Sequence, residues 1–202
     1  RAIELAFAQF AESANGVVSD LLRDELAMRQ AAAATLLMHL KLSDSVWPLL
    51  KRNAAPGLRG HLIHWLATRS PNPEMLISRF KIEQDKGIRC AILLSLGKHE
   101  LSNSEKLSVQ NELNALYSND PDPGLHSIIE WLLRGWDRFE ALEKSQQHVQ
   151  VSDKGRLEPG TRWYSTSQGQ TFVVLEASEF LMGAPDSEAG FNEREVLHRQ
   201  QL

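Results

Sequence analysis

Apolar residues recur at helical spacing from the start of the chain to about residue 144, in runs separated by turn signals. The clearest breakers are the segments 70–73 and 118–121, in which proline cannot continue a helix. Between the breakers the spacing predicts helices over 17–26, 46–52, 75–84 and 104–117, with Ser104 as a candidate cap. These helices alternate with a second set that shares a common start.

Each helix of the second set begins with an apolar residue followed by a basic residue or histidine. The four starts are Met28-Arg29, Leu58-Arg59, Ile88-Arg89 and Leu125-His126, so the register advances by 30, 30 and 37 residues. Glycine turns introduce three of them, in the segments 55–57, 85–87 and 122–124. The chain therefore returns repeatedly to the same kind of helix, which indicates an internal repeat.

Two helices per unit at this spacing are typical of an α-solenoid, in which each pair buries its apolar stripe by stacking on the next pair. We therefore expect a mostly α fold, with a solenoid over residues 1–144. Its last helix starts at Gly124, and the apolar positions continue to Leu142. The units resemble HEAT repeats over about residues 15–140, and this resemblance implies a scaffold that contacts protein partners.

The pattern changes character near residue 150. The polar stretch 145–161 is interpreted as a linker. Short β-type runs follow at 162–164, 171–175 and 179–182, and 167–170 is a candidate hairpin turn in which Gly169 is free to adopt positive φ. Residues 162–202 are therefore predicted to form a short, truncated β-containing segment.

Three pieces of this segment carry a family resemblance: Trp163-Tyr164, then 169–174, then Glu179 to Gly183 with acidic residues after it. They resemble the start of the formylglycine-generating enzyme (sulfatase-modifying factor) family, as it occurs in large modular bacterial proteins. The resemblance implies that the complete domain is a metal-dependent oxidoreductase using copper or iron, with calcium as a structural ion. A serine/threonine kinase domain upstream is a further expectation about the parent protein.

The family's catalytic cysteines and metal ligands lie later than any residue of this sequence. No catalytic, cofactor-binding or metal-binding residue is therefore assigned within residues 1–202. The alternative interpretation is a non-catalytic protein interaction module, in which residues 162–202 are only a terminal hairpin. We expect the polypeptide itself to have no enzymatic activity.

Composition narrows the function classes. The 202 residues carry a formal net charge of −4, so they lack the basic surface that a general nucleic-acid or membrane-surface binder needs. The single cysteine excludes an internal disulfide and a thiolate zinc cluster, and it is consistent with a cytoplasmic location. No apolar run is long enough to span a membrane. Arg1 already lies within a helical pattern, so we interpret the sequence as a fragment.

A possible partner-binding surface comes from Arg29, Arg59 and Arg89, which recur with His126 at equivalent positions. A basic ladder on the inner surface of a solenoid would suit an acidic partner. In the structural alternative, which we favour, each side chain caps or bridges to an acidic residue of the preceding turn. The candidate acidic residues are Asp24, Asp85 and Asp122.

For three weaker candidate sites we favour a purely structural explanation. His61 and His64 have a spacing that can present two imidazoles to a metal, but a helix face or a repeat interface is the better interpretation. Cys90 follows a cation that can activate a thiol, although its apolar neighbours favour a structural role. Four acidic residues can supply oxygen ligands for calcium or form a solvated loop, namely Asp186, Glu188, Glu193 and Glu195.

Overall fold

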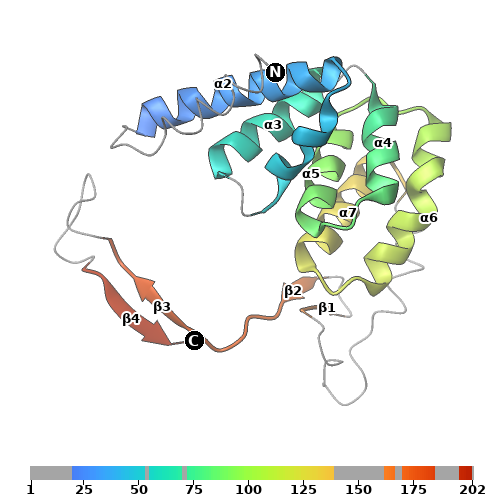
Figure 1. The fold of residues 1–202 in the computed structure, drawn as a ribbon. Coiled ribbons are helices and arrows are strands. Elements are labelled where there is room, and N and C mark those ends of the chain that lie inside the picture. Colours follow the sequence, from blue (N-terminus) through green and yellow to red (C-terminus); the bar gives the residue numbers. More distant parts are fainter. Residues whose placement is uncertain are drawn as a thin grey trace. The chain divides into compact units, whose positions relative to one another are not determined.

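A computed structural model describes residues 20–52, 55–69, 72–138, 162–166, 170–184 and 196–201. The chain divides into two compact units, Arg1–Gln150 and Val151–Leu202. In the described residues the first unit is helical, and the second contains short antiparallel strands (Figure 1). The predicted mostly α class with a small β-containing segment is therefore confirmed. The predicted linker, 145–161, lies outside the described residues.

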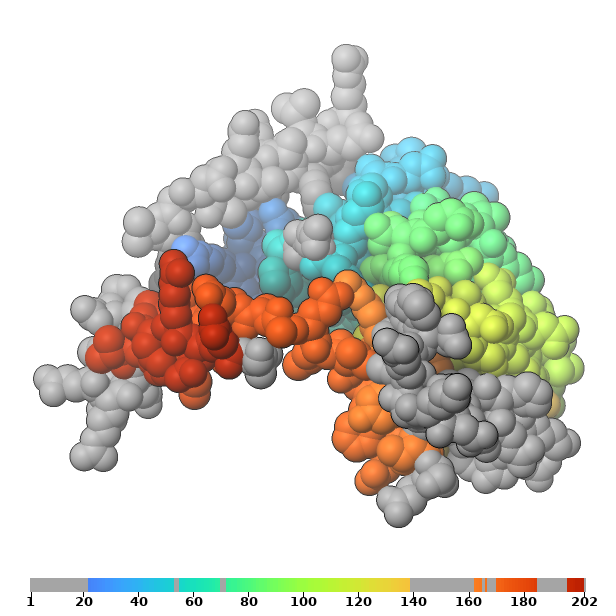
Figure 2. Space-filling view, turned by 90° about the horizontal axis from the view of Figure 1, so that it is seen from below, coloured from blue at the N-terminus to red at the C-terminus, as the bar shows by residue number. Residues whose placement is uncertain are grey.

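The helices of the first unit are arranged in two neighbouring rows. Helices α3, α5 and α7 contact one another in that order, while α4 packs on α5 and α6 packs on both α4 and α7. Helix α2 lies along α3. Figure 2 shows the same sequence of neighbours on the surface, from cyan through green to yellow-green. The elements are α2 (Asp20–His39), the 3₁₀ segments η2 (Ser43–Ser45) and η3 (Trp47–Leu50), α3 (Pro56–Arg69), α4 (Pro73–Ile82), α5 (Lys86–Leu96), α6 (Asn103–Asn119) and α7 (Pro123–Gly135).

Side-chain caps fix the starts of four of these helices. The caps are Asn72 for α4, Asp85 for α5, Ser102 for α6 and Asp122 for α7, and each accepts a bond from a backbone N–H of the first turn. Ser102 also forms a capping box with Glu105. The cap of α6 is therefore Ser102, and the prediction of Ser104 is wrong, because the glutamate three positions later favours Ser102.

Two helices end in left-handed residues other than glycine. Lys41 after α2 and Asp137 after α7 have φ of 63° and 55°. The following residue in each case donates its N–H back to the carbonyl five positions earlier, from Leu42 to Leu37 and from Arg138 to Leu133, as in a Schellman motif. The prediction that the last helix continues to Leu142 is therefore wrong for residues 136–138, and residues 139–142 lie outside the described part.

The first predicted helix pair is a single helix. The structure has α2 over Asp20–His39, because no glycine or proline interrupts the chain between 26 and 28 and the alanines that follow favour a helix. In place of the predicted helix 46–52 the structure has one short 3₁₀ segment, η3, with Pro48 near its start, and a second, η2, lies just before it. Arg29 consequently lies in the middle of a helix rather than near its start.

Helix α5 forms the centre of the helical unit. It contacts α3, α4, α7 and η3, and eight of its eleven residues are buried. The three others are Lys86, Arg89 and Leu94. Side chains of α3, α4, α6 and α7 complete the same core, among them Leu62, Phe80, Leu113 and Ile129 with no exposed surface. Because α5 packs against several neighbouring elements, its position is fixed in the unit, and the polar groups at its amino end are held in place with it.

The second unit contains two separate hairpin-like pairs. Strand β1 (Trp163–Ser165) pairs antiparallel with β2 (Thr171–Val173), and β3 (Glu179–Met182) pairs antiparallel with β4 (His198–Gln201). The first three strands confirm the predicted ones, although the predicted turn residues 167–169 lie outside the described part. The polar sequence of β4 gave no signal for a strand. All residues of β3 are exposed, including Phe180 and Leu181.

Candidate functional site

Three helices of one row, α3, α5 and α7, share a glycine and a basic residue or histidine in their first turn. The glycines are Gly57, Gly87 and Gly124, and two positions later stand Arg59, Arg89 and His126. Each of these three side chains bonds a carbonyl at the end of the preceding helical segment, which has no intrahelical partner of its own. The bonds run from Arg59 Nε to Leu50 O (2.9 Å), from Arg89 Nε to Glu83 O (2.7 Å) and from His126 Nδ1–H to Tyr117 O (3.0 Å).

Two of the three predicted ladder residues, Arg59 and Arg89, thus form hydrogen bonds within the helical unit. Arg59 donates a second bond to Gly87 O at 3.2 Å, and Arg89 donates one to Glu112 at 3.1 Å. Arg29 differs, since its side chain is 62% exposed and pairs with Glu25 on the same helix. The structure therefore separates Arg29 from Arg59 and Arg89, and binding of a partner by these residues stays a prediction.

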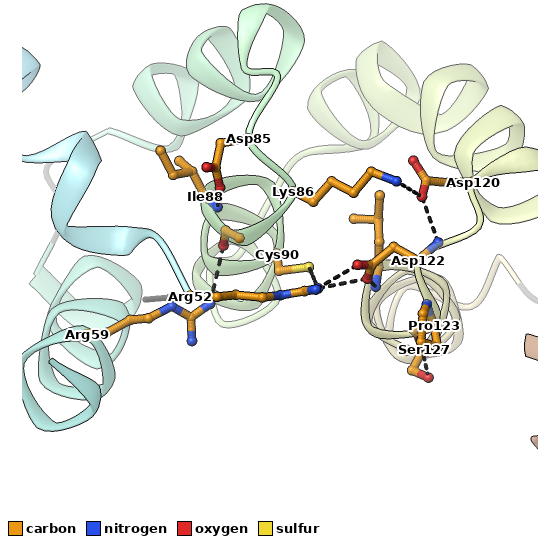
Figure 3. A network of polar contacts seen from close by, with 12 residues as sticks. Arg52, Arg59, Asp85, Lys86, Ile88, Cys90, Asp120, Asp122, Pro123 and Ser127 are labelled. Atoms are coloured by element: carbon orange, nitrogen blue, oxygen red, sulfur yellow. Dashed lines mark hydrogen bonds and ion pairs between the residues drawn. The ribbon is translucent and has the colours of Figure 1, made fainter. Parts of the chain in front are cut away.

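Arg52 joins the amino ends of α5 and α7 (Figure 3). Its guanidinium donates to both carboxylate oxygens of Asp122, at 2.6 and 2.7 Å, and to Cys90 Sγ at 3.4 Å. The bond to Asp122 raises the pKa of Arg52, and the same bond lowers the pKa of Asp122 below its ordinary value. Sequence reasoning missed Arg52, because its partner lies 70 residues away.

The two acidic residues before α7 extend this network. Asp122 Oδ1 accepts the N–H of Leu125 at 2.8 Å and so caps α7 while it binds Arg52. Asp120 Oδ1 accepts bonds of 2.8 Å from the Asp122 N–H and from Lys86 Nζ at the start of α5.

The favoured alternative for the ladder holds in part. Arg29 does pair with an acidic residue one turn earlier, Glu25, and Arg89 pairs with Glu112. Of the candidate acidic residues, Asp85 and Asp122 instead cap helices, and Asp24 pairs with His61.

Two of the three shared glycines, Gly87 and Gly124, leave room for Arg52. A Cβ on Gly87 would lie 2.7 Å from the backbone nitrogen of Arg52, and one on Gly124 would lie 2.8 Å from its Nη2. Both distances are shorter than real Cβ contacts allow. Glycine in the first turns of α5 and α7 therefore allows a close approach between chain segments, whereas a Cβ on Gly57 would meet only Ala27 Cβ, at 3.4 Å.

The remaining candidates have structural surroundings. Cys90 is 2% exposed, and burial raises the pKa of its thiol although Arg52 opposes the shift, so it is poorly suited to act as a nucleophile. His61 Nε2 lies 2.7 Å from Asp24 on α2, and His64 is exposed. Within the described ranges no group of three His, Cys, Asp or Glu side chains could hold a metal ion. The four calcium candidates, Asp186, Glu188, Glu193 and Glu195, lie outside those ranges.

Loss of the Arg52–Asp122 contact should destabilise the helical unit. We expect Arg52→Gln to lower the free energy of unfolding by about 1–2 kcal/mol. This loss is smaller than that expected for a fully buried hydrogen bond between charged groups, because the Arg52 side chain is 47% exposed. A double-mutant cycle with Asp122→Asn, measured by urea denaturation, should give coupling of about 1 kcal/mol.

The Arg134–Glu130 pair is the matched control, because its arginine is similarly exposed, at 46%, but both members lie within α7 and join no two helices. Its cycle, Arg134→Gln with Glu130→Gln, should give only about 0.3–0.5 kcal/mol. Equal coupling in the two cycles would show that Arg52 does not hold α5 and α7 together.

His126 should make the helical unit sensitive to mild acid. Burial lowers its pKa, with the Tyr117 carbonyl and Glu130 opposing the shift, so the folded protein favours the neutral ring more than the unfolded chain does. The unfolded value is about 6.5, so this stability is complete above about pH 6.5 and is lost as the pH falls toward the folded pKa.

The change His126→Phe keeps a ring beside Tyr117, which stacks on it at 4.0 Å, but removes the titration. We expect the variant to lose about 1–2 kcal/mol at pH 7.5, since the Tyr117 carbonyl loses its donor. Its further loss between pH 7.5 and 5.5 should be smaller than that of the unchanged protein, as followed by urea denaturation at both pH values. His64→Gln, at an exposed position, should keep the original pH dependence; a steep dependence retained in His126→Phe would contradict the assignment.

Two further findings concern membrane-spanning helices and similarity to known proteins. No helix of the described ranges is long and apolar enough to cross a membrane. No protein-family model, curated protein or solved structure matches this chain.

Proposed function

We propose that the helical unit is a HEAT-like α-solenoid that serves as a scaffold for a protein partner. The observation that carries the proposal is the repeated first turn of α3, α5 and α7, in which a glycine precedes a side chain that bonds the end of the preceding segment. Recurrence of one arrangement in every second helix, α3, α5 and α7, is expected of stacked helix pairs that contact their neighbours.

The contacts between helices support the same proposal. Helix α5 packs against α3 on one side and α7 on the other, and α4 packs on α6 in the second row. Such an arrangement leaves the outer faces of successive helices available as one extended surface, which repeat proteins use for binding. No feature of the described residues favours a reaction over binding, since Cys90 is buried and no metal-ligating cluster is found among them.

A photo-crosslinking experiment tests the scaffold proposal. A photoreactive amino acid at Leu94, one of three partly exposed positions of α5, should capture a protein in the cells that make this chain. The captured protein, once purified, should bind the purified full chain in calorimetry with a defined stoichiometry. If no crosslinked protein is found, or if the purified candidate does not bind, the proposal is wrong.

We further propose that residues 162–202 begin a formylglycine-generating-enzyme-like domain in a modular protein. The positions of β1, β2 and β3 and the exposure of apolar side chains on β3 support this, because a two-stranded pair without a covered face is marginal in water. Copper, iron or calcium would belong to the complete domain. The codons after Leu202 in the gene test it: they should continue the domain with later cysteines or histidines, and a stop codon there would favour the terminal hairpin of an interaction module.

The polypeptide itself should not oxidise a cysteine-containing sulfatase-type peptide. It has one cysteine, Cys90, and that residue is buried beneath Arg52, whereas the proposed chemistry needs a cysteine pair and a metal. The assay supplies copper and oxygen and follows the peptide by mass spectrometry. Product formation above the peptide-only control would contradict this expectation.

A further inference from the structure

The row of helices α3, α5 and α7 differs in charge from the rest of the chain. Although the chain has a net charge of −4, Glu130 is the only acidic residue among the residues of these three helices, which carry five lysines and arginines. The negative charge of the unit lies on other helices and on the caps. The five are Arg59, Arg69, Lys86, Arg89 and Arg134.

Three ion pairs at α5 and α7 turn their positive members toward solvent, whereas in a fourth, Arg89–Glu112, the carboxylate is the more exposed member, at 32% against 14%. The Arg52, Lys86 and Arg134 side chains are 47%, 43% and 46% exposed. Their partners Asp122, Asp120 and Glu130 are 11%, 13% and 20% exposed. Since the carboxylates of these three pairs are the more buried members, the outward charge that Arg52, Lys86 and Arg134 give to the α5–α7 seam is positive.

An exposed tryptophan lies at the other end of the same seam. Trp131 of α7 crosses over Gly97 at the end of α5, where a Cβ would lie 2.3 Å from its ring. The Trp131 side chain remains 42% exposed, and Lys98 Nζ lies 5.8 Å from the ring centre. Tryptophan and arginine are among the residues that most often dominate the binding energy of a protein interface.

We propose that the α5–α7 seam, defined by Arg52, Lys86, Lys98, Trp131 and Arg134, binds an extended acidic segment of a partner protein. The proposal rests on the scaffold function and names the chemistry of its partner. Helix α5 is about 16 Å long at 1.5 Å per residue, a length that about five extended residues cover. Carboxylates of such a segment would pair with the exposed cations, and an apolar side chain would pack on Trp131.

Fluorescence anisotropy of the full chain with a labelled twelve-residue peptide of Asp, Glu and Leu tests this. The peptide should bind, and salt should weaken the binding. Lys98→Glu and Trp131→Ala should each raise Kd at least about tenfold. Lys81→Glu, an exposed charge reversal on α4, should leave Kd unchanged. Lys98→Gln and Trp131→Phe should give smaller losses, and circular dichroism checks that all variants fold.

The opposite results would overturn the proposal. They are failure of the acidic peptide to bind, equal binding of a matched peptide with lysine in place of Asp and Glu, or an equal effect of Lys81→Glu. Tighter binding of a labelled twelve-nucleotide oligothymidylate than of the peptide would assign the seam to nucleic acid instead. If a purified crosslinked partner binds the chain but Lys98→Glu and Trp131→Ala do not weaken it, the scaffold function stands and the seam is not its binding surface.

Discussion

Replacing Leu93 by alanine should lower the free energy of unfolding of the helical unit by about 2–5 kcal/mol. Leu93 has no exposed surface and belongs to α5, which contacts α3, α4 and α7. Truncation there leaves a cavity that neighbours on several sides would have to close together, so little relaxation is expected. Urea denaturation should show a lower midpoint with an unchanged slope.

Leu107→Ala is the matched control for this change. Leu107 lies on α6 and is 55% exposed, so the same truncation should alter the free energy of unfolding by no more than about 0.5 kcal/mol. Losses of similar size in the two variants would mean that α5 is not the centre of the core.

Substituting alanine at two helical glycines should change stability in opposite directions. Gly87→Ala should destabilise the helical unit by about 1–3 kcal/mol, since the new Cβ would meet the backbone nitrogen of Arg52 at 2.7 Å and would have to displace main chain. Gly60→Ala should stabilise it by about 0.5–1 kcal/mol, because the new Cβ would have no atom within 4 Å apart from its own stretch of helix, and alanine favours a helix.

Both glycine variants can be measured by thermal unfolding in one buffer, with the unchanged protein beside them. The opposite signs are the informative result, because both substitutions add the same methyl group within a helix. A stabilising Gly87→Ala would show that Arg52 does not pass over this helix, and it would remove the physical reason for glycine in the repeated turn.

Much of the repeat could be predicted from the sequence, because its signals are local. The turn glycines and the capping aspartates, Asp85 and Asp122, stand beside the helices that they start. The equivalence of Arg59 and Arg89 is also a local signal, because each stands two positions after a turn glycine. Arg29 does not share their place in a helix, since a match of neighbouring residues does not reveal helix boundaries, and α2 runs unbroken through Arg29 from Asp20 to His39.

The rest of the site could not be predicted, because it depends on contacts between distant segments. Arg52 lies in a turn after η3, and only the stacking of α5 and α7 brings Asp122 to its guanidinium. The exposure of Trp131 likewise depends on where α5 ends at Gly97. Strand β4 was missed for another reason: its residues are polar and show no β pattern, so only pairing with β3 identifies it.

Hydrogen exchange of the backbone amides of the full chain, followed by mass spectrometry, tests most directly whether the helical unit is organised around α5. The amides of α5 should exchange most slowly, at the rate of global unfolding, those of α3 and α7 should follow, and those of β3 and β4 should exchange fastest. Exchange of α5 as fast as that of β3, or faster than that of α6, would contradict the account.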